Sequence, residues 1–136
     1  MFESHGRYSL NVVDQTLFVD IVGPMDLELA KNIFADARQL VKRHFKGQWA
    51  SYVNLEQWQL FTPEIMPNMH EFQIWCQKNK LAVEVCLVGS SAMKRAARES
   101  MVMEGSGTQI HYVQSQQQGI EWLKGEGFLA GDYEDH

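Results

Sequence analysis

The chain has 136 residues, of which 45% are hydrophobic and 21% are charged. This length suits one domain, which can bury enough surface to fold without disulfides. There are 17 acidic and 12 basic residues, and the resulting net charge of −5 argues against a basic surface for nucleic acid or an anionic membrane.

The sequence predicts no membrane segment, leader or metal centre. Its N-terminus lacks the apolar core of a signal peptide, and no run approaches 18 apolar residues. The five histidines form no pair at metal-ligand spacing, and Cys76 and Cys86 form no C-x-x-C motif. We therefore expect a cytoplasmic protein with free buried thiols, without membrane insertion, and with neither a metal nor another cofactor.

The first half of the chain predicts a hairpin, a helix and a strand. Residues 8–13 and 17–22 alternate between apolar and polar side chains across a short polar turn, and Gly23-Pro24 is expected to end the second strand. Residues 26–45 change to helical spacing, with Asp26 or Met25 at the N-cap and basic residues in the last turn. Residues 49–55 follow as a short strand, and residues 56–62 as a connection.

The second half predicts three more helices and two more strands. Thr62 is expected to cap a helix that has Pro63 in its first turn and becomes regular only from Pro67, continuing to about residue 78. Residues 81–88 form the most continuous apolar run, typical of a strand inside a sheet covered by helices. A helix over 92–103, a break at 104–107, a strand over 109–113 and a helix over 116–124 capped by Ser115 complete the chain.

The expected order is thus ββαβαβαβα. Alternating strands and helices require crossover connections, so we expect a single-domain α/β sandwich with a mixed, mostly parallel sheet. The domain would cover residues 8–125, between an N-terminal tail (1–7) and a polar C-terminal tail (126–136), and residues 131–136 are expected to fray.

Three short segments carry a resemblance to a known family. Residues 19–26 (VDIVGPMD) form a strand that enters a helix through Gly, residues 83–89 (VEVCLVG) form an apolar strand ending in Gly, and residues 119–123 (GIEWL) form a closing helix. With the element order, they resemble the STAS domain and, within it, the branch similar to sporulation protein AA, an anti-sigma-factor antagonist. That branch is grouped with SEC14/CRAL-TRIO-type folds.

The resemblance implies a regulatory domain, but one motif differs. Phospho-switched STAS domains carry a serine in an Asp-Ser-Ser-Gly type loop after the third strand, whereas residues 52–58 here read YVNLEQW. Thr62 is the nearest following hydroxyl, and we interpret it as a helix cap. The usual serine phospho-switch is therefore predicted to be absent.

The resemblance also places a partner surface on the third-strand loop and the second helix. The residues that we expect to bind a partner or an apolar ligand are Asn54, Trp58, Phe61, Met66, Met69, Phe72 and Trp75. Methionine and aromatic side chains adapt well to apolar ligands, but the same helical spacing is also typical of plain core packing.

Two further positions have both a functional and a structural interpretation. Ser90, Ser91 and Lys94 could hold an anion at a helix N-terminus, but a serine cap followed by a solvated helix face with Lys94, Arg95 and Arg98 explains them better. Glu84 interrupts the apolar run over 81–88, so it must be paired or protonated if it is buried, unless it reaches water at the sheet rim.

Three functions remain open at this point. The first is a non-enzymatic regulatory module that binds a protein partner or itself through an exposed apolar patch. The second is a binder of a small apolar or lipid-like ligand, which requires a cavity of roughly 300 Å³ or more. The third is an enzyme of unrecognised type, which requires convergent polar groups. No nucleic-acid partner is expected.

Overall fold

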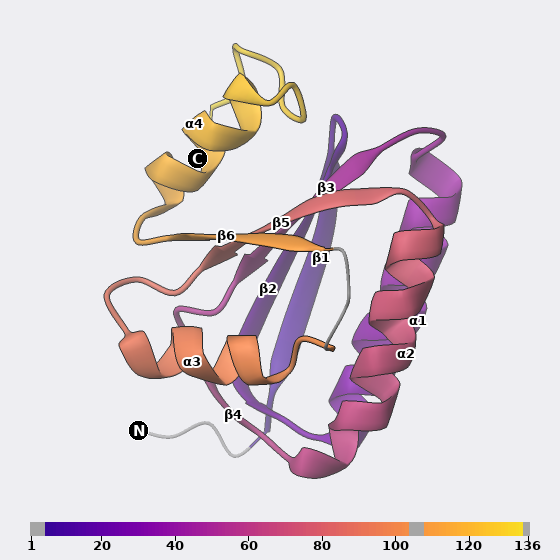
Figure 1. Cartoon of the computed structure of the whole chain (residues 1–136), viewed down its shortest axis with the longest axis vertical. Helices are drawn as coiled ribbons and strands as arrows, with labels where there is room; N and C mark the ends of the chain where they lie inside the picture. The colour runs from indigo at the N-terminus through magenta and orange to yellow at the C-terminus, as the bar shows by residue number, and fades with distance from the viewer. Residues whose placement is uncertain (1–4, 104–107, 135–136) are drawn as a thin grey trace.

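The computed structural model describes residues 5–103 and 108–134, and it confirms the predicted order of helices and strands with one added strand (Figure 1). The elements are β1 (Arg7–Val13), β2 (Thr16–Met25), α1 (Leu27–His44), β3 (Trp49–Asn54), β4 (Trp58–Phe61), a 3₁₀ turn (Pro63–Ile65), α2 (Met66–Lys78), β5 (Leu81–Leu87), α3 (Ala92–Ser100), β6 (Gln109–Val113) and α4 (Gln116–Gly125). The predicted break at 104–107 lies outside the described residues.

The sheet is mixed and mostly parallel, as expected. Its strand order is β1-β2-β3-β5-β6, with β1 antiparallel to β2 and the other neighbours parallel. Strand β5 lies between β3 and β6 and buries both of its faces, which explains its continuous apolar run.

Alternating side chains divide the core between the two faces of the sheet. Leu17, Val19 and Ile21 of β2 belong to the cluster that also contains buried residues of α1 and α2. Ala50 and Val85 point to the opposite face and belong to the cluster that includes α4. Figure 1 shows α1 and α2 side by side at the right. Helix α3 lies at the lower left, and α4 lies at the upper left, away from the other three helices.

The second strand does not end at Gly23-Pro24, so that expectation is wrong. Gly23 has a positive φ of 80°, which glycine adopts without strain, and its N–H donates to the carbonyl oxygen of Gln57 at 2.9 Å. Strand β2 continues to Met25 through a register irregularity and pairs there with β4. Residues 58–61 are consequently a strand, and only residues 55–57 connect β3 to it.

Residues 128–133 pack on the sheet after α4, which corrects the expected tail from residue 126 and the expected fraying at Tyr133. The carbonyl oxygen of Phe128 accepts from the Thr16 hydroxyl at 2.9 Å, Leu129 is buried, and the ring of Tyr133 stacks on Phe18. These contacts, one hydrogen bond and two apolar ones, join residues far apart in the sequence, so the polar composition of the segment did not indicate them. At the other predicted boundary, α3 ends at Ser100, earlier than residue 103.

Candidate functional site

The predicted anion site is built as a helix cap. The Ser91 hydroxyl accepts from the backbone N–H of Lys94 at 3.1 Å, and the Lys94 ammonium donates to the carbonyl oxygen of Glu56. Ser90 is exposed beside them. The serine and the lysine thus serve α3 and its contact with the loop after β3, and no contact among the described residues favours an anion there.

The seven residues of the predicted partner surface do not form one exposed patch. Trp58 and Met69 belong to the core, with 2% and 8% of their surface exposed. The remaining positions are half-buried: Asn54, Phe61, Met66, Phe72 and Trp75. Helix α2 therefore uses most of its apolar side chains for packing.

The aromatic residues of α2 are held against α1. Phe72 stacks on Phe34 at a ring-centroid distance of 4.5 Å and on Trp75 at 6.1 Å. The Arg38 guanidinium lies 5.5 Å from the Phe72 centroid and 5.9 Å from that of Trp75. This packing explains how Trp75 is covered although it lies off the main apolar stripe of the helix.

Among the described side chains, the exposed large apolar ones are Met93 and Ile74. Met93 lies in the first turn of α3 and exposes 78% of its surface, whereas Ile74 on α2 exposes 39%. Neither was selected from the sequence. Beside the start of α3, an open hollow of about 430 Å³ is lined by Arg7, Val22, Glu56, Gln57, Trp58, Gln59 and Lys94.

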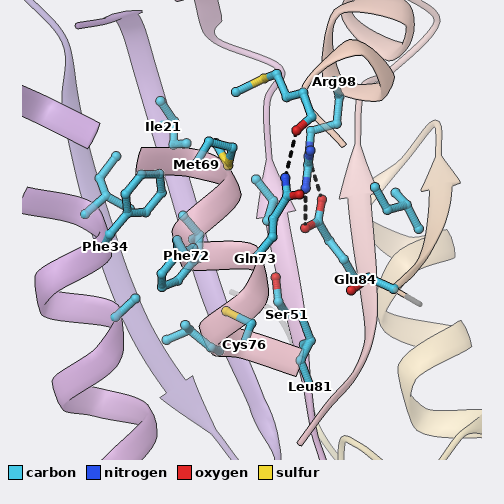
Figure 2. Close-up of a pocket in the computed structure, with 18 of the residues that line it drawn as sticks. Ile21, Phe34, Ser51, Met69, Phe72, Gln73, Cys76, Leu81, Glu84 and Arg98 are labelled. Atoms are coloured by element: carbon cyan, nitrogen blue, oxygen red, sulfur yellow. Dashed lines mark hydrogen bonds and ion pairs between the residues drawn. The ribbon is translucent and has the colours of Figure 1, made fainter. Parts of the chain in front are cut away.

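A second, mainly apolar cavity of about 90 Å³ lies between the sheet and the helices. Its walls come from strands β2 to β6, from α1 and α2, and from the end of α3 with residues 101–102. Met69 and Phe72 line the cavity, as the ligand-binding hypothesis expects, but Met66 does not. Figure 2 shows Phe34, Met69 and Phe72 on the side opposite to Arg98 and Glu84.

A buried ion pair forms the polar end of this cavity. The Arg98 Nε and Nη2 atoms donate to the two carboxylate oxygens of Glu84 at 2.9 and 2.8 Å, and the two residues are only 8% and 6% exposed (Figure 2). Burial lowers the pKa of Arg98, but the charge and hydrogen bonds of Glu84 outweigh burial and leave it above its ordinary value. The pair is therefore charged and bidentate.

Arg98 is buried in the ion pair, so its expected place on the solvated face of α3 is wrong. We expected its side chain to coat the solvated face of α3, but it crosses to the sheet, because a carboxylate inside β5 needs a buried partner. Glu84 within an apolar strand was the only sequence signal for this pair. It did not indicate which cation would reach it.

The two thiols lie in the core near the ion pair and are free, as predicted. Burial, with the charge of Glu84 as the second cause, raises the pKa of Cys76 to about 12 and also raises the pKa of Cys86. Both thiols are therefore protonated at neutral pH and are weak nucleophiles.

The described ranges contain neither a cluster of metal-binding side chains nor a helix that could span a membrane. Residues 5–103 and 108–134 hold no group of three or more His, Cys, Asp or Glu side chains that could bind a metal ion. Within the same ranges, no helix has the length and apolar character needed to cross a bilayer.

No protein-family model and no curated protein matches the chain. Solved structures do match it. An uncharacterised DUF3478-family protein from Shewanella loihica, described as having a SpoIIAA-like fold, has a TM-score of 0.67 at 8% identity and covers 87% of this chain and 93% of its own. The fold is SpoIIAA-like.

Two structures of SpoIIAA itself agree with this assignment. The anti-sigma factor antagonist SpoIIAA in its unphosphorylated form has a TM-score of 0.56 at 14% identity, covering 88% of this chain and 99% of its own. The Bacillus cell fate determinant SpoIIAA in its phosphorylated form has a TM-score of 0.53 at 10% identity, covering 86% and 99%. These matches support the STAS-like part of the sequence resemblance, and they give no support to the SEC14/CRAL-TRIO relation.

Proposed function

We propose that this SpoIIAA-like domain is a non-enzymatic regulatory module that binds a protein partner, or a second copy of itself, at the strand-end face. We define this face as Glu56, Gln57, Met93 and Lys94 with the adjoining hollow. The observation that carries the proposal is Met93, an apolar side chain next to Lys94 in the first turn of α3 that exposes 78% of its surface. A flexible apolar anchor inside a polar rim is typical of protein interfaces.

The architecture of the face supports this proposal. The Lys94 ammonium binds the carbonyl oxygen of Glu56 and so joins the start of α3 to the loop after β3. Both segments follow the carboxyl ends of neighbouring parallel strands, where open α/β sheets bind their ligands. The proposal moves the partner surface from α2, whose side chains pack on α1, to the start of α3.

Site-specific photo-crosslinking tests the strand-end face. In source-cell extract, Met93→p-benzoylphenylalanine should give a discrete adduct with one protein or with a second copy of the chain, because position 93 would lie inside the interface. The matched control is Gln117→p-benzoylphenylalanine at an exposed position of α4, which should not give this adduct. Identical adduct patterns from both positions, or no adduct from position 93, would contradict the proposal.

We also propose that the module works without the usual serine switch. Residues 54–58 carry no hydroxyl group, and Ser51 is 7% exposed within β3. The Thr62 hydroxyl donates to the Glu64 carboxylate at 3.2 Å instead of capping the helix, which corrects our expectation. A phosphate on Thr62 would therefore meet a like charge.

Incubation with source-cell lysate and ATP tests the missing switch. Because the loop after β3 lacks an acceptor serine, mass spectrometry should detect no phosphate on residues 54–62. A phosphorylated Thr62 in this experiment would restore a switch at the start of the second helix and overturn this part of the proposal.

The two other functions find less support. A cavity of about 90 Å³ is smaller than the roughly 300 Å³ expected for a lipid-like ligand. An enzyme would need a free acid, base or nucleophile, whereas Glu84 and Arg98 neutralise each other and both thiols are protonated. A regulatory module that binds a protein partner is therefore the best supported of the three functions.

A further inference from the structure

The cavity beneath α1 and α2 contains two buried hydrogen-bond donors without acceptors. Within the described residues, neither Arg98 Nη1 nor the Trp58 indole Nε1 has a hydrogen-bond partner, although both residues line the cavity and are at most 8% exposed. Buried donors are rarely left unpaired, because desolvation costs more than a typical hydrogen bond gains.

The neighbouring polar groups do not supply the missing acceptor. Both oxygens of Glu84 already accept from Nε and Nη2 of Arg98. The Gln73 amide is also engaged at both ends: its Nε2 donates to the carbonyl oxygen of Met101 at 2.8 Å, and its Oε1 accepts from the N–H of Met103 at 2.9 Å. At this end of the cavity, Arg98 Nη1 remains as a donor.

The volume and lining restrict what could accept from this donor. A volume of about 90 Å³ is below the roughly 150 Å³ of an engineered apolar cavity that binds benzene, so a ligand of only a few heavy atoms fits. Most of the wall is apolar, contributed by side chains such as Leu17, Met69, Phe72 and Leu81. The ligand must therefore be compact and largely apolar.

The ion pair restricts the ligand's charge. Glu84 already neutralises Arg98, so an anionic ligand would place a second negative charge beside Glu84 in a poorly solvated site. A cation would be repelled by the charge of the Arg98 guanidinium. A neutral molecule with one strong acceptor oxygen meets neither penalty, and it can accept from a charged donor.

We propose that this cavity is a binding site for a compact, neutral, largely apolar molecule whose carbonyl oxygen accepts a hydrogen bond from Arg98 Nη1. Small ketones, lactones and esters belong to this chemical class. The proposal goes beyond partner binding and does not depend on the strand-end face, because Arg98, the group that would recognise the ligand, does not belong to that face. Either proposal can therefore fail without the other.

The first experiment is an NMR titration of the full chain with 2-butanone. Addition of 2-butanone should shift the Arg98 guanidinium resonances. Intermolecular NOEs should connect the methyl groups of 2-butanone to Leu17, Met69 or Leu81. Butanoate serves as the charged probe and should bind more weakly. Absence of these shifts and NOEs, or tighter binding of butanoate, would overturn the proposal without the need for any variant.

The second experiment asks whether the guanidinium recognises the carbonyl. The hydrocarbon 2-methyl-1-butene matches 2-butanone in shape but carries no acceptor oxygen. The preference for 2-butanone over this hydrocarbon should fall at least about tenfold in the Glu84→Met/Arg98→Met double variant, which removes the donor and the charge together. Gln117→Ala on exposed α4 is the matched control and should keep the wild-type preference. An unchanged preference in the double variant would exclude Arg98 as the recognition group.

Discussion

Replacing Arg98 by methionine should lower the free energy of unfolding by about 3–5 kcal/mol. The substitution leaves the Glu84 carboxylate, which is 6% exposed, without the two hydrogen bonds at 2.8 and 2.9 Å that now neutralise it. An uncompensated buried charge is among the most destabilising single changes in a protein. Urea denaturation followed by circular dichroism measures the difference.

The double variant Glu84→Met/Arg98→Met is the control for this prediction. It removes both charges and keeps apolar volume at both positions, so its stability should equal or exceed that of the wild type. A loss below about 1 kcal/mol in Arg98→Met alone would mean that Glu84 finds water or another partner. A double variant as unstable as the single one would assign the loss to packing instead of charge.

Replacing Trp49 by alanine should cost about 3–5 kcal/mol of unfolding free energy. The indole is 1% exposed, stacks on Phe45 with ring centroids 5.4 Å apart, and donates from Nε1 to the carbonyl oxygen of Asn79 at 2.7 Å. Alanine would leave a large cavity where α1, β3 and the end of α2 meet. Thermal and urea unfolding provide the measurement.

Trp49→Phe separates the hydrogen bond from the bulk of the side chain. Phenylalanine keeps a ring that can stack on Phe45 and loses the N–H donor to Asn79, so we expect a smaller loss of about 1–2 kcal/mol. Equal losses in Trp49→Phe and Trp49→Ala would show that the hydrogen bond dominates. A loss below about 1 kcal/mol in Trp49→Ala would contradict the observed packing.

The two proposed sites would give the domain separate functions at separate places. Met93 on the strand-end face is exposed, whereas the cavity of the proposed carbonyl site lies between the sheet and the helices. Arg98 and Met93 both belong to α3 and are five residues apart. Arg98 is buried, whereas Met93 is exposed to solvent. Comparing the photo-crosslink from position 93 with and without 2-butanone would show whether the two sites communicate.

The sequence predicted most helices and strands because their signals are local. Alternation indicated β1, most of β2 and β6, helical spacing indicated α1, and continuous apolar character placed β5 inside the sheet. Strand β4 was missed because four residues carry too little periodicity. Its pairing with the end of β2 depends on the positive φ of Gly23, which we had interpreted as a terminator.

The candidate sites were less predictable, since exposure depends on which elements meet. Helical spacing on α2 indicated apolar faces but did not show that Phe72 would stack on Phe34 or that Arg38 would lie near Trp75. Met93 is an apolar residue in a short, charged helix, and the sequence pattern did not show whether its side chain would face the core or the solvent. No motif identified the cavity, because its walls come from eight helices and strands spread along the chain.

By itself, the sequence determined the order of the elements, except β4, and the single α/β domain, because spacing along the backbone dictates which side chains share a face. Only the tertiary structure decided where the charges lie. Glu84 and Arg98 are 14 residues apart on a strand and a helix, and they pair because α3 docks over β5. A charged side chain at the surface can be solvated by water, whereas a buried one requires a partner. Whether Glu84 is buried depends on tertiary packing, which the local sequence pattern does not show.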